Sequence, residues 1–298
     1  MMAALKPELR GELRYDVPLK SMTAWRVGGN AQRLFRPCDL EDLCRFLSHL
    51  PKREPLLWLG LGSNLLIRDA GVRGTVIAMH GALSELTKIN PCVLRAEAGV
   101  PCAKVARFAA KQGLTGTEFL AGIPGTMGGA LAMNAGAFGG ETWQWVEAVE
   151  TVGRSGRIHH RAPEAFRVSY RHVILPAEEW FVAAHLRLKP GDSQACLKQI
   201  RSLLSRRSEG QPTGVASCGS VFRNPPGDFA ARLIEAADLK GQVIGGAKVS
   251  EKHANFIINT GKATAADIEA LINRVRQRVE QVHGIELKPE VRIVGEAS

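Results

Sequence analysis

Three glycine-rich segments constrain this chain more than any other feature of its sequence. They are Arg26-Val27-Gly28-Gly29-Asn30, Gly60-Leu61-Gly62-Ser63-Asn64 and Gly122–Ala130, the last continuing to Asn134-Ala135-Gly136-Ala137. Glycine lets a backbone approach a ligand closely and turn its N–H groups toward phosphate oxygens. Each segment taken alone is best interpreted as a tight turn. Three together, the second directly after the apolar run Leu56–Leu59, favour a protein that binds a dinucleotide.

The second and third segments match neither of the two common phosphate-binding motifs. Gly62 is followed by Ser63-Asn64-Leu65, so the spacing of the Rossmann fingerprint is absent. Neither segment ends in the Gly-Lys-Ser/Thr of a P-loop. The sequence therefore predicts that a different fold holds the diphosphate.

Apolar periodicity predicts an α+β chain. Four helices are expected: one after the capping residue Asp39, one from Pro101 to Gly113, one from Ser193 to Arg207, and one from Thr264 to Gly284 with Val282 on its apolar stripe. Strand-like runs lie between them, at Leu56–Leu61, Thr75–Met79, Val93–Ala98, Val146–Val152, Trp180–Leu188 and Asn255–Asn259.

Composition excludes several classes of protein. The 298 residues suffice for two or three small domains. No signal peptide is visible at the start, and no run approaches the roughly 18 apolar residues of a membrane span, so we expect a cytoplasmic protein. The six cysteines form no C-x-x-C pair and no zinc-like spacing with histidine. We therefore predict reduced cysteines and no metal site.

The net charge of +10 is open to two interpretations. A basic surface suits nucleic acid, but the basic residues are spread along the chain and no nucleic-acid-binding motif accompanies them. An enzyme whose ligands carry several phosphates also gains from a positive field, because the field steers anions toward its site. Charge alone does not choose between these interpretations.

Six motifs in order along the chain resemble those of the UDP-N-acetylenolpyruvoylglucosamine reductase family, from about Thr23 to Gly295. The motifs are Gly60-Leu61-Gly62-Ser63-Asn64-Leu65-Leu66, Gly122-Ile123-Pro124-Gly125-Thr126-Met127-Gly128-Gly129, Tyr170-Arg171, Gly219-Ser220-Val221-Phe222-Arg223-Asn224-Pro225, His253-Ala254-Asn255-Phe256 and Pro289-Glu290-Val291-Arg292. One such motif could arise by chance, but six in the same order make the resemblance specific.

The resemblance implies an FAD-binding fold of the vanillyl-alcohol-oxidase type, made of two α+β subdomains, and a C-terminal α+β substrate domain. The expected bounds are 1–73 and 74–190 for the subdomains and 191–285 for the substrate domain, with 286–298 packing back on the first. It also implies noncovalent FAD, with NADPH as reductant. The residues expected to hold FAD are Gly60, Gly62, Ser63, Asn64, Gly122, Pro124, Gly125, Thr126, Gly128, Gly129 and Asn134.

By the same resemblance, the reaction is the reduction of an enolpyruvyl ether on a UDP-sugar, in the synthesis of the bacterial cell-wall precursor. Ser220 would be the acid that protonates the substrate carbon, and Arg171 and Glu290 would stabilise the enolate-like intermediate. Tyr170, Asn224 and Arg207 would bind substrate. We expect a monomer with a small-molecule UDP-sugar substrate and no nucleic-acid or membrane partner.

Each of these residues has a plainer interpretation. A serine in a Gly-Ser turn usually bonds a backbone amide, Arg171 could be a surface cation, Glu290 a strand-edge carboxylate paired with Arg292, and Arg207 a solvated helix end. Only Tyr15 and Tyr170 are present, and the stretch from Arg171 to Trp180 is short. The chain therefore resembles the subclass that lacks an inserted tyrosine loop. The competing functions are an FAD oxidase of the same superfamily and a basic nucleic-acid-binding module.

Overall fold

The computed structural model describes residues 9–296. Contacts divide them into two compact units, each assembled from separate stretches of sequence. The first unit comprises the described residues up to Arg14, then Leu34–Gly60 and Thr75–Arg206. The second comprises Tyr15–Arg33, Leu61–Gly74 and the described residues from Arg207 onward. The three domains expected from the sequence divide the chain differently, and that division stays a prediction.

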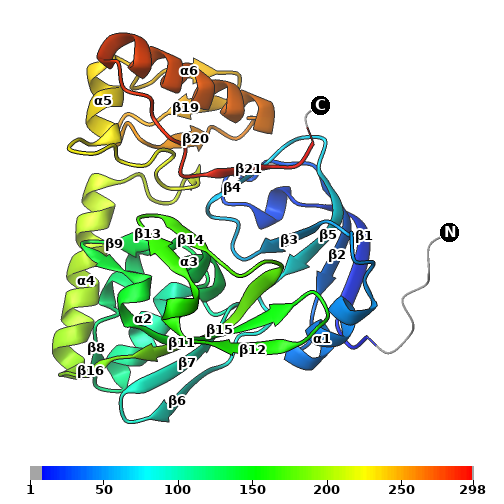
Figure 1. Ribbon diagram of the computed structural model, residues 1–298. Coiled ribbons are helices and arrows are strands. Elements are labelled where there is room, and N and C mark those ends of the chain that lie inside the picture. The colour runs from blue at the N-terminus through cyan, green and yellow to red at the C-terminus, as the bar shows by residue number, and fades with distance from the viewer. Residues whose placement is uncertain (1–8, 297–298) are drawn as a thin grey trace. The chain divides into compact units, whose positions relative to one another are not determined.

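The first unit is built on an antiparallel sheet with the strand order β12-β11-β15-β7-β6 (Figure 1). Its strands are β6 (Leu86–Asn90), β7 (Val93–Glu97), β11 (Val146–Gly153), β12 (Ile158–Arg161) and β15 (Glu179–Arg187). The predicted strands at 93–98, 146–152 and 180–188 are confirmed to within two residues.

The two faces of this sheet differ, because successive side chains of a strand point to opposite sides. Leu94 and Ala96 of β7 and Ala184 of β15 belong to the largest core cluster. Arg95, between Leu94 and Ala96, is directly opposite His185, which follows Ala184. Both side chains therefore lie on the other face of the sheet. One face of the sheet is therefore core, while the other carries these charged side chains and, further along β11, the buried Val152 of a second core cluster.

A hydrogen-bonded network occupies the charged face. Arg95 Nε and Nη2 each donate to a Glu150 oxygen at 2.7 Å, and His185 Nε2 lies 2.7 Å from Glu150 Oε1. The Arg95 guanidinium, together with His185, lowers the pKa of Glu150 to about 2, although burial acts in the opposite direction. The network connects three neighbouring strands.

The helices of the first unit are α1 (Leu40–His49), α2 (Cys102–Lys111), α3 (Met127–Met133) and most of α4 (Ser193–Gly210), whose residues from Arg207 onward belong to the second unit. All but α3 were predicted. The segment Gly122–Ala130 was expected to be a loop throughout, and that expectation is wrong from Met127 onward. Glycine-rich sequence has low helix propensity. Here tertiary bonds start the helix, since Met127 N donates to Val100 O and Gly128 N to Ala98 O.

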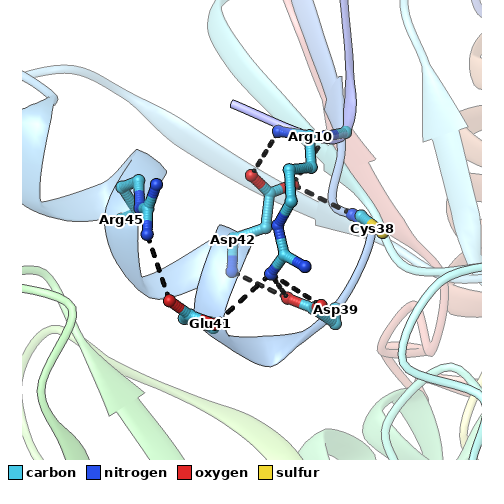
Figure 2. Close-up of polar contacts among 7 residues, drawn as sticks. Arg10, Cys38, Asp39, Glu41, Asp42 and Arg45 are labelled. Carbon is cyan, nitrogen blue, oxygen red and sulfur yellow. Dashed lines mark hydrogen bonds and ion pairs between the residues drawn. The ribbon is translucent and has the colours of Figure 1, made fainter. Parts of the chain in front are cut away.

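Two aspartates organise the start of α1 (Figure 2). Asp39 is its N-cap, as predicted, and accepts a hydrogen bond from Asp42 N at 2.9 Å. The buried Asp42 carboxylate accepts three more, from the backbone N–H groups of Arg10, Gly11 and Cys38 at 2.8–3.0 Å. One side chain thereby satisfies three backbone donors and ties the preceding chain to the helix.

The sheet β1-β2-β5-β3 consists of β1 (Glu12–Pro18), β2 (Asn30–Arg36), β5 (Val72–Ala78) and β3 (Leu56–Leu59). β3 and β5 pair in parallel, and β3 leads directly into the second glycine-rich segment. Shorter elements connect the rest: η1 (Lys20–Met22), β8 (Leu114–Thr115), η2 (Glu118–Gly122), β9 (Gly136–Ala137), β10 (Gly140–Glu141), η3 (Thr142–Trp145), η4 (Pro163–Ala165), β13 (Arg167–Ser169), β14 (His172–Ile174) and β16 (Lys189–Pro190).

The second unit contains a sheet in the order β17-β20-β19-β18, covered by helix α6 (Figure 1). Its elements are β17 (Ala216–Ser217), α5 (Ala230–Ala236), β18 (Val243–Ile244), β19 (Ala247–Val249), β20 (Ile257–Asn259) and α6 (Ala265–His283). The predicted cap Thr264 and the left-handed Gly284 that ends α6 are confirmed. Val282 is 42% exposed, so its assignment to the apolar stripe is wrong.

A parallel pair closes the second unit. β21 (Arg292–Val294) lies beside β4 (Leu65–Ile67), so the C-terminal part of the chain pairs with the residues that follow the second glycine-rich segment. Within residues 9–296, no helix has both the length and the hydropathy needed to cross a membrane.

Candidate functional site

Gly60, the first residue of the second glycine-rich segment, meets the third segment within the first unit. A Cβ built on Gly60, at the end of β3, would lie 2.6 Å from Thr126 Oγ1, at the start of α3. Only glycine allows this approach. The structure thus brings Gly60 beside the third segment, which was predicted from sequence to hold the same ligand.

Both segments offer backbone donors. Within residues 9–296, no hydrogen bond is donated by the N–H groups of Leu61, Gly62, Ser63, Gly125, Thr126 and Gly129. The carbonyls are used instead: Gly62 O accepts from Ala24 N at 3.1 Å and Gly125 O from Cys102 N at 2.9 Å. Backbone N–H groups that remain available in such turns suit an anion, so the residues of each segment by themselves fit a phosphate group.

The glycines of these segments differ in whether a side chain would clash with the rest of the protein. At Gly62, where φ is +60°, a Cβ would lie 2.3 Å from Met22 O; at Gly122 it would lie 2.6 Å from the Phe138 ring, and at Gly128 2.9 Å from Ala98 Cβ. Glycine is required at Gly62 and Gly128 because backbone or buried atoms lie in the way, whereas at Gly122 the obstacle is the exposed Phe138 ring. Gly129 differs, because it is exposed and the nearest atom to its Cβ position is 3.9 Å away.

Ser220 lies in the second unit, on a short segment with a firmly held backbone. Val221 N donates to Asn255 O at 2.9 Å, Phe222 N donates to Asn255 Oδ1 at 2.9 Å, and Asn255 Nδ2 donates to Phe222 O at 2.8 Å. The Ser220 side chain is half-buried, and its hydroxyl makes no hydrogen bond within the described chain. The plain role of a turn serine, bonding a nearby amide, is therefore not observed.

Glu290 lies beside the same segment. Its N–H donates to Val221 O at 2.7 Å, and its carbonyl accepts from Asn64 Nδ2 at 3.1 Å. Arg292 N in turn donates to Asn64 O at 3.0 Å. The second unit thus joins Ser220, Glu290 and residues 61–64 of the glycine-rich segment.

Cys218 strengthens this junction. Its thiol lies 3.6 Å from both Gly62 O and Leu65 O, and burial raises the pKa of the thiol to about 12. Such a thiol stays protonated at neutral pH and is a poor nucleophile. Cys218 therefore packs the site and does not react in it.

Arg171 lies in the first unit, in the two-residue turn between β13 and β14. Its φ of 54° is in the left-handed region, which is uncommon for a residue with a side chain. Its guanidinium donates from Nη2 to Gly136 O at 2.6 Å and from Nη1 to Asn134 O at 3.4 Å, and stacks 5.4 Å from the Tyr170 ring. It is therefore held at a defined place and is not a mobile surface cation.

Asn134 connects this turn to α3. It is the left-handed C-cap of that helix, with a buried side chain. Its Nδ2 donates to Glu141 Oε2 at 2.9 Å and to Ser169 O at 3.3 Å, while its Oδ1 accepts from Trp143 N at 3.2 Å. These bonds give Asn134 a structural role. Its contact with FAD stays a prediction.

The remaining predicted substrate ligands lie on helix ends. Asn224 Oδ1 accepts from Ala230 N, the first residue of α5, at 3.1 Å. Arg207 lies near the end of α4, half-buried, where its Nε donates to Gln211 Oε1 at 3.2 Å and burial lowers the pKa of its guanidinium. Arg207 and Asn224 thus bond different partners, Gln211 and Ala230.

Sequence reasoning assigned no role to Asn255, although it lies in one of the six motifs. The Asn255 side chain nevertheless positions the backbone next to Ser220. A signal was available, since an asparagine flanked by Ala254 and Phe256 in a strand-like run must find polar partners once buried.

Two family models match this chain. Residues 31–161 match the FAD binding domain, and residues 211–294 match the C-terminal domain of UDP-N-acetylenolpyruvoylglucosamine reductase. The reductase of that name from Alkalilimnicola ehrlichii is 61% identical over 297 residues, covering 100% of this chain and 99% of the relative. That from Methylococcus capsulatus is 61% identical over 288 residues, covering 97% and 95%. The chain belongs to the UDP-N-acetylenolpyruvoylglucosamine reductase family.

Solved structures agree with this family assignment. The crystal structure of UDP-N-acetylenolpyruvylglucosamine reductase from Thermus caldophilus matches with a TM-score of 0.82 and 34% identity, over 95% of this chain and 98% of that one. The predicted family and the α+β fold with an FAD-binding part and a C-terminal reductase domain are confirmed.

Proposed function

We propose that this protein is an FAD-dependent oxidoreductase that uses NADPH to reduce UDP-N-acetylglucosamine enolpyruvate to UDP-N-acetylmuramate, in peptidoglycan precursor synthesis. Full-length similarity to reductases of this name carries the proposal. The geometry around Ser220 supports it, because a half-buried hydroxyl without a partner among residues 9–296 lies on a firmly held backbone.

FAD would be held noncovalently by the second and third glycine-rich segments. Their available N–H groups would face its diphosphate, which needs donors and no covalent tether. The proposed contacts are Gly60, Gly62, Ser63, Asn64, Gly122, Pro124, Gly125, Thr126, Gly128, Gly129 and Asn134. When bound, FAD supplies a hydride, received from NADPH, to the alkene of the substrate.

The chain itself would then handle charge and a proton. Hydride addition shifts negative charge toward the substrate carboxylate, where the fixed guanidinium of Arg171 would stabilise it. The Ser220 hydroxyl would donate its proton to the adjacent carbon. Glu290, next to the Ser220 segment, is the proposed third member of this set, and the Asn255 amide keeps the segment in position.

Three further side chains would bind substrate. Tyr170 is 48% exposed beside Arg171 and offers a flat surface and a hydroxyl. Asn224 keeps its amide nitrogen available beyond the bond of its oxygen to Ala230 N. Arg207 would meet the UDP diphosphate, since an arginine stays charged even when burial lowers its pKa. We further propose that the protein is a cytoplasmic monomer without a nucleic-acid partner.

Anaerobic stopped-flow spectroscopy tests the function directly. NADPH should bleach the flavin absorbance, and addition of the enolpyruvyl UDP-sugar should restore it with formation of the reduced product. A flavin that oxygen but not the enolpyruvyl substrate reoxidises, with an alcohol or sugar as electron donor, would indicate an oxidase instead. A colourless protein with salt-sensitive DNA binding would reject the enzyme altogether.

A further inference from the structure

Two histidines and a carboxylate converge on the charged face of the sheet in the first unit. Glu150 of β11 is directly opposite His160 of β12, and His185 of β15 lies beside Glu150 on its other flank. The His160 and His185 rings have centroids 6.5 Å apart. One ligand atom from each of the three residues lies within 4.8 Å of the other two.

These residues form the donor set that transition metals prefer. Zn²⁺ is commonly bound by imidazole nitrogens and a carboxylate oxygen at about 2.0–2.2 Å, which places ligand atoms roughly 3.3 Å apart. His160 is exposed, so rotation of its side chain can close the longest separation without moving a strand. Glu150 Oε1 and His185 Nε2, now 2.7 Å apart, would open slightly as the metal takes the place of the proton between them, which would be released to water.

Arg95 decides how such a site would behave. Its fork of two 2.7 Å hydrogen bonds fixes the Glu150 carboxylate, which is the role played by outer partners of metal ligands. The positive charge of Arg95 also weakens the attraction of the Glu150 carboxylate for a metal ion. The site should therefore select ions that bind imidazole strongly, such as Zn²⁺, over Mg²⁺, which prefers oxygen ligands.

We propose that Glu150, His160 and His185 form a binding site for a divalent transition-metal ion, with Arg95 orienting the carboxylate. The ion would connect β12, β11 and β15 and so stabilise the sheet by mass action. None of the residues proposed for FAD binding or for the reduction belongs to this set, so the inference is independent of the proposed function.

Titration calorimetry of the flavin-loaded protein with ZnCl₂ tests the proposal. Cys38 is exposed, so all proteins should carry Cys38→Ser to remove a competing thiol. We expect one saturable Zn²⁺ site in this parent and no matching binding of Mg²⁺. His160→Ala and His185→Ala should each weaken Zn²⁺ by at least about 10–100-fold, the loss that even an outer partner of a ligand causes.

His159→Ala is the matched control. His159 is adjacent in sequence but opposite Thr151 in the register, so its side chain points to the other face, and its loss should leave Zn²⁺ affinity unchanged. Thermal melting gives a second measurement: Zn²⁺ should raise the melting temperature of the parent and of His159→Ala but not of His160→Ala. Absence of saturable Zn²⁺ binding to the parent, or equal affinity in all four proteins, would overturn the site.

Discussion

The Ser220 segment in the second unit is positioned by its backbone, whereas the Arg171 turn in the first unit is positioned by its side chain. At Ser220, the amide of Asn255 and the N–H of Glu290 hold the main chain, and the hydroxyl takes no part. At Arg171, the guanidinium itself bonds the carbonyls of Gly136 and Asn134 across a left-handed turn. A change of side chain should therefore separate chemistry from folding at Ser220 but alter both at Arg171.

The largest effect is expected for Ser220→Ala. Reoxidation of reduced flavin by the enolpyruvyl substrate should fall by about 10²–10⁴-fold, the usual contribution of a positioned general acid. FAD content, flavin reduction by NADPH and the free energy of unfolding should stay near the parent values, because the hydroxyl supports no structure. Stopped-flow absorbance and urea unfolding provide these measurements. A variant that reoxidises at the parent rate would remove Ser220 from the mechanism.

Arg171 should lose both activity and stability. Arg171→Ala should slow the same half-reaction by about 10²–10³-fold, as when one stabilising donor is lost. Arg171→Gly should be as slow, yet more stable than the alanine variant by about 1–2 kcal/mol, because glycine adopts left-handed backbone without strain. Urea unfolding of the two variants makes the comparison. Equal stabilities would show that the turn does not hold residue 171 in this conformation.

Asn255→Ala tests whether backbone bonds alone position Ser220. Two buried backbone groups of Phe222 would lose their partner, each at a cost of about 1–3 kcal/mol. Substrate-driven reoxidation should slow more than reduction by NADPH, since only the former needs the proton donor in place. Asn224→Ala is the matched control, because it removes one bond at an exposed residue and should cost about 1 kcal/mol or less. Similar unfolding curves for both variants would contradict the role given to Asn255.

The smallest effects should come from the paired glycines of α3. Gly128→Ala should destabilise the protein by about 1–3 kcal/mol through overpacking against Ala98, with or without flavin. Gly129→Ala should leave the flavin-free protein unchanged, while Gly129→Leu should weaken FAD, because only a bound ligand would meet that side chain. Fluorescence titration with FAD distinguishes them. Undiminished FAD affinity in Gly129→Leu would place the diphosphate elsewhere.

Local chemistry accounts for what sequence could predict of this fold. The caps Asp39 and Thr264 and the terminating Gly284 act within one turn of their own helix, so they are visible in sequence. Helix α3 is invisible there, since its first turn depends on bonds to Ala98 and Val100. Val282 follows the apolar period of α6 but lies in its last turn and is exposed, because periodicity does not report which turns of a helix are covered.

The same limit applies to the sites. The motifs around Ser220 and Glu290 are evident in sequence, but their junction depends on a bond between Glu290 N and Val221 O that no periodicity reports. The cluster of Glu150, His160 and His185 is harder still to foresee. Its members come from three strands, so their spacing matches no metal motif, and only the sheet register brings them together.

The parallel pairing of β4 with β21 has a consequence for how this protein is made. Asn64 and Glu290, joined by a hydrogen bond, are 226 positions apart. Ribosomes add about 5–20 residues per second, so the segment around Asn64 would wait roughly ten seconds or more for its partner. During translation the unpaired edge of β4 would remain able to pair with other strands or other chains. The second unit would therefore be completed only when β21, made at the end of synthesis, pairs with β4.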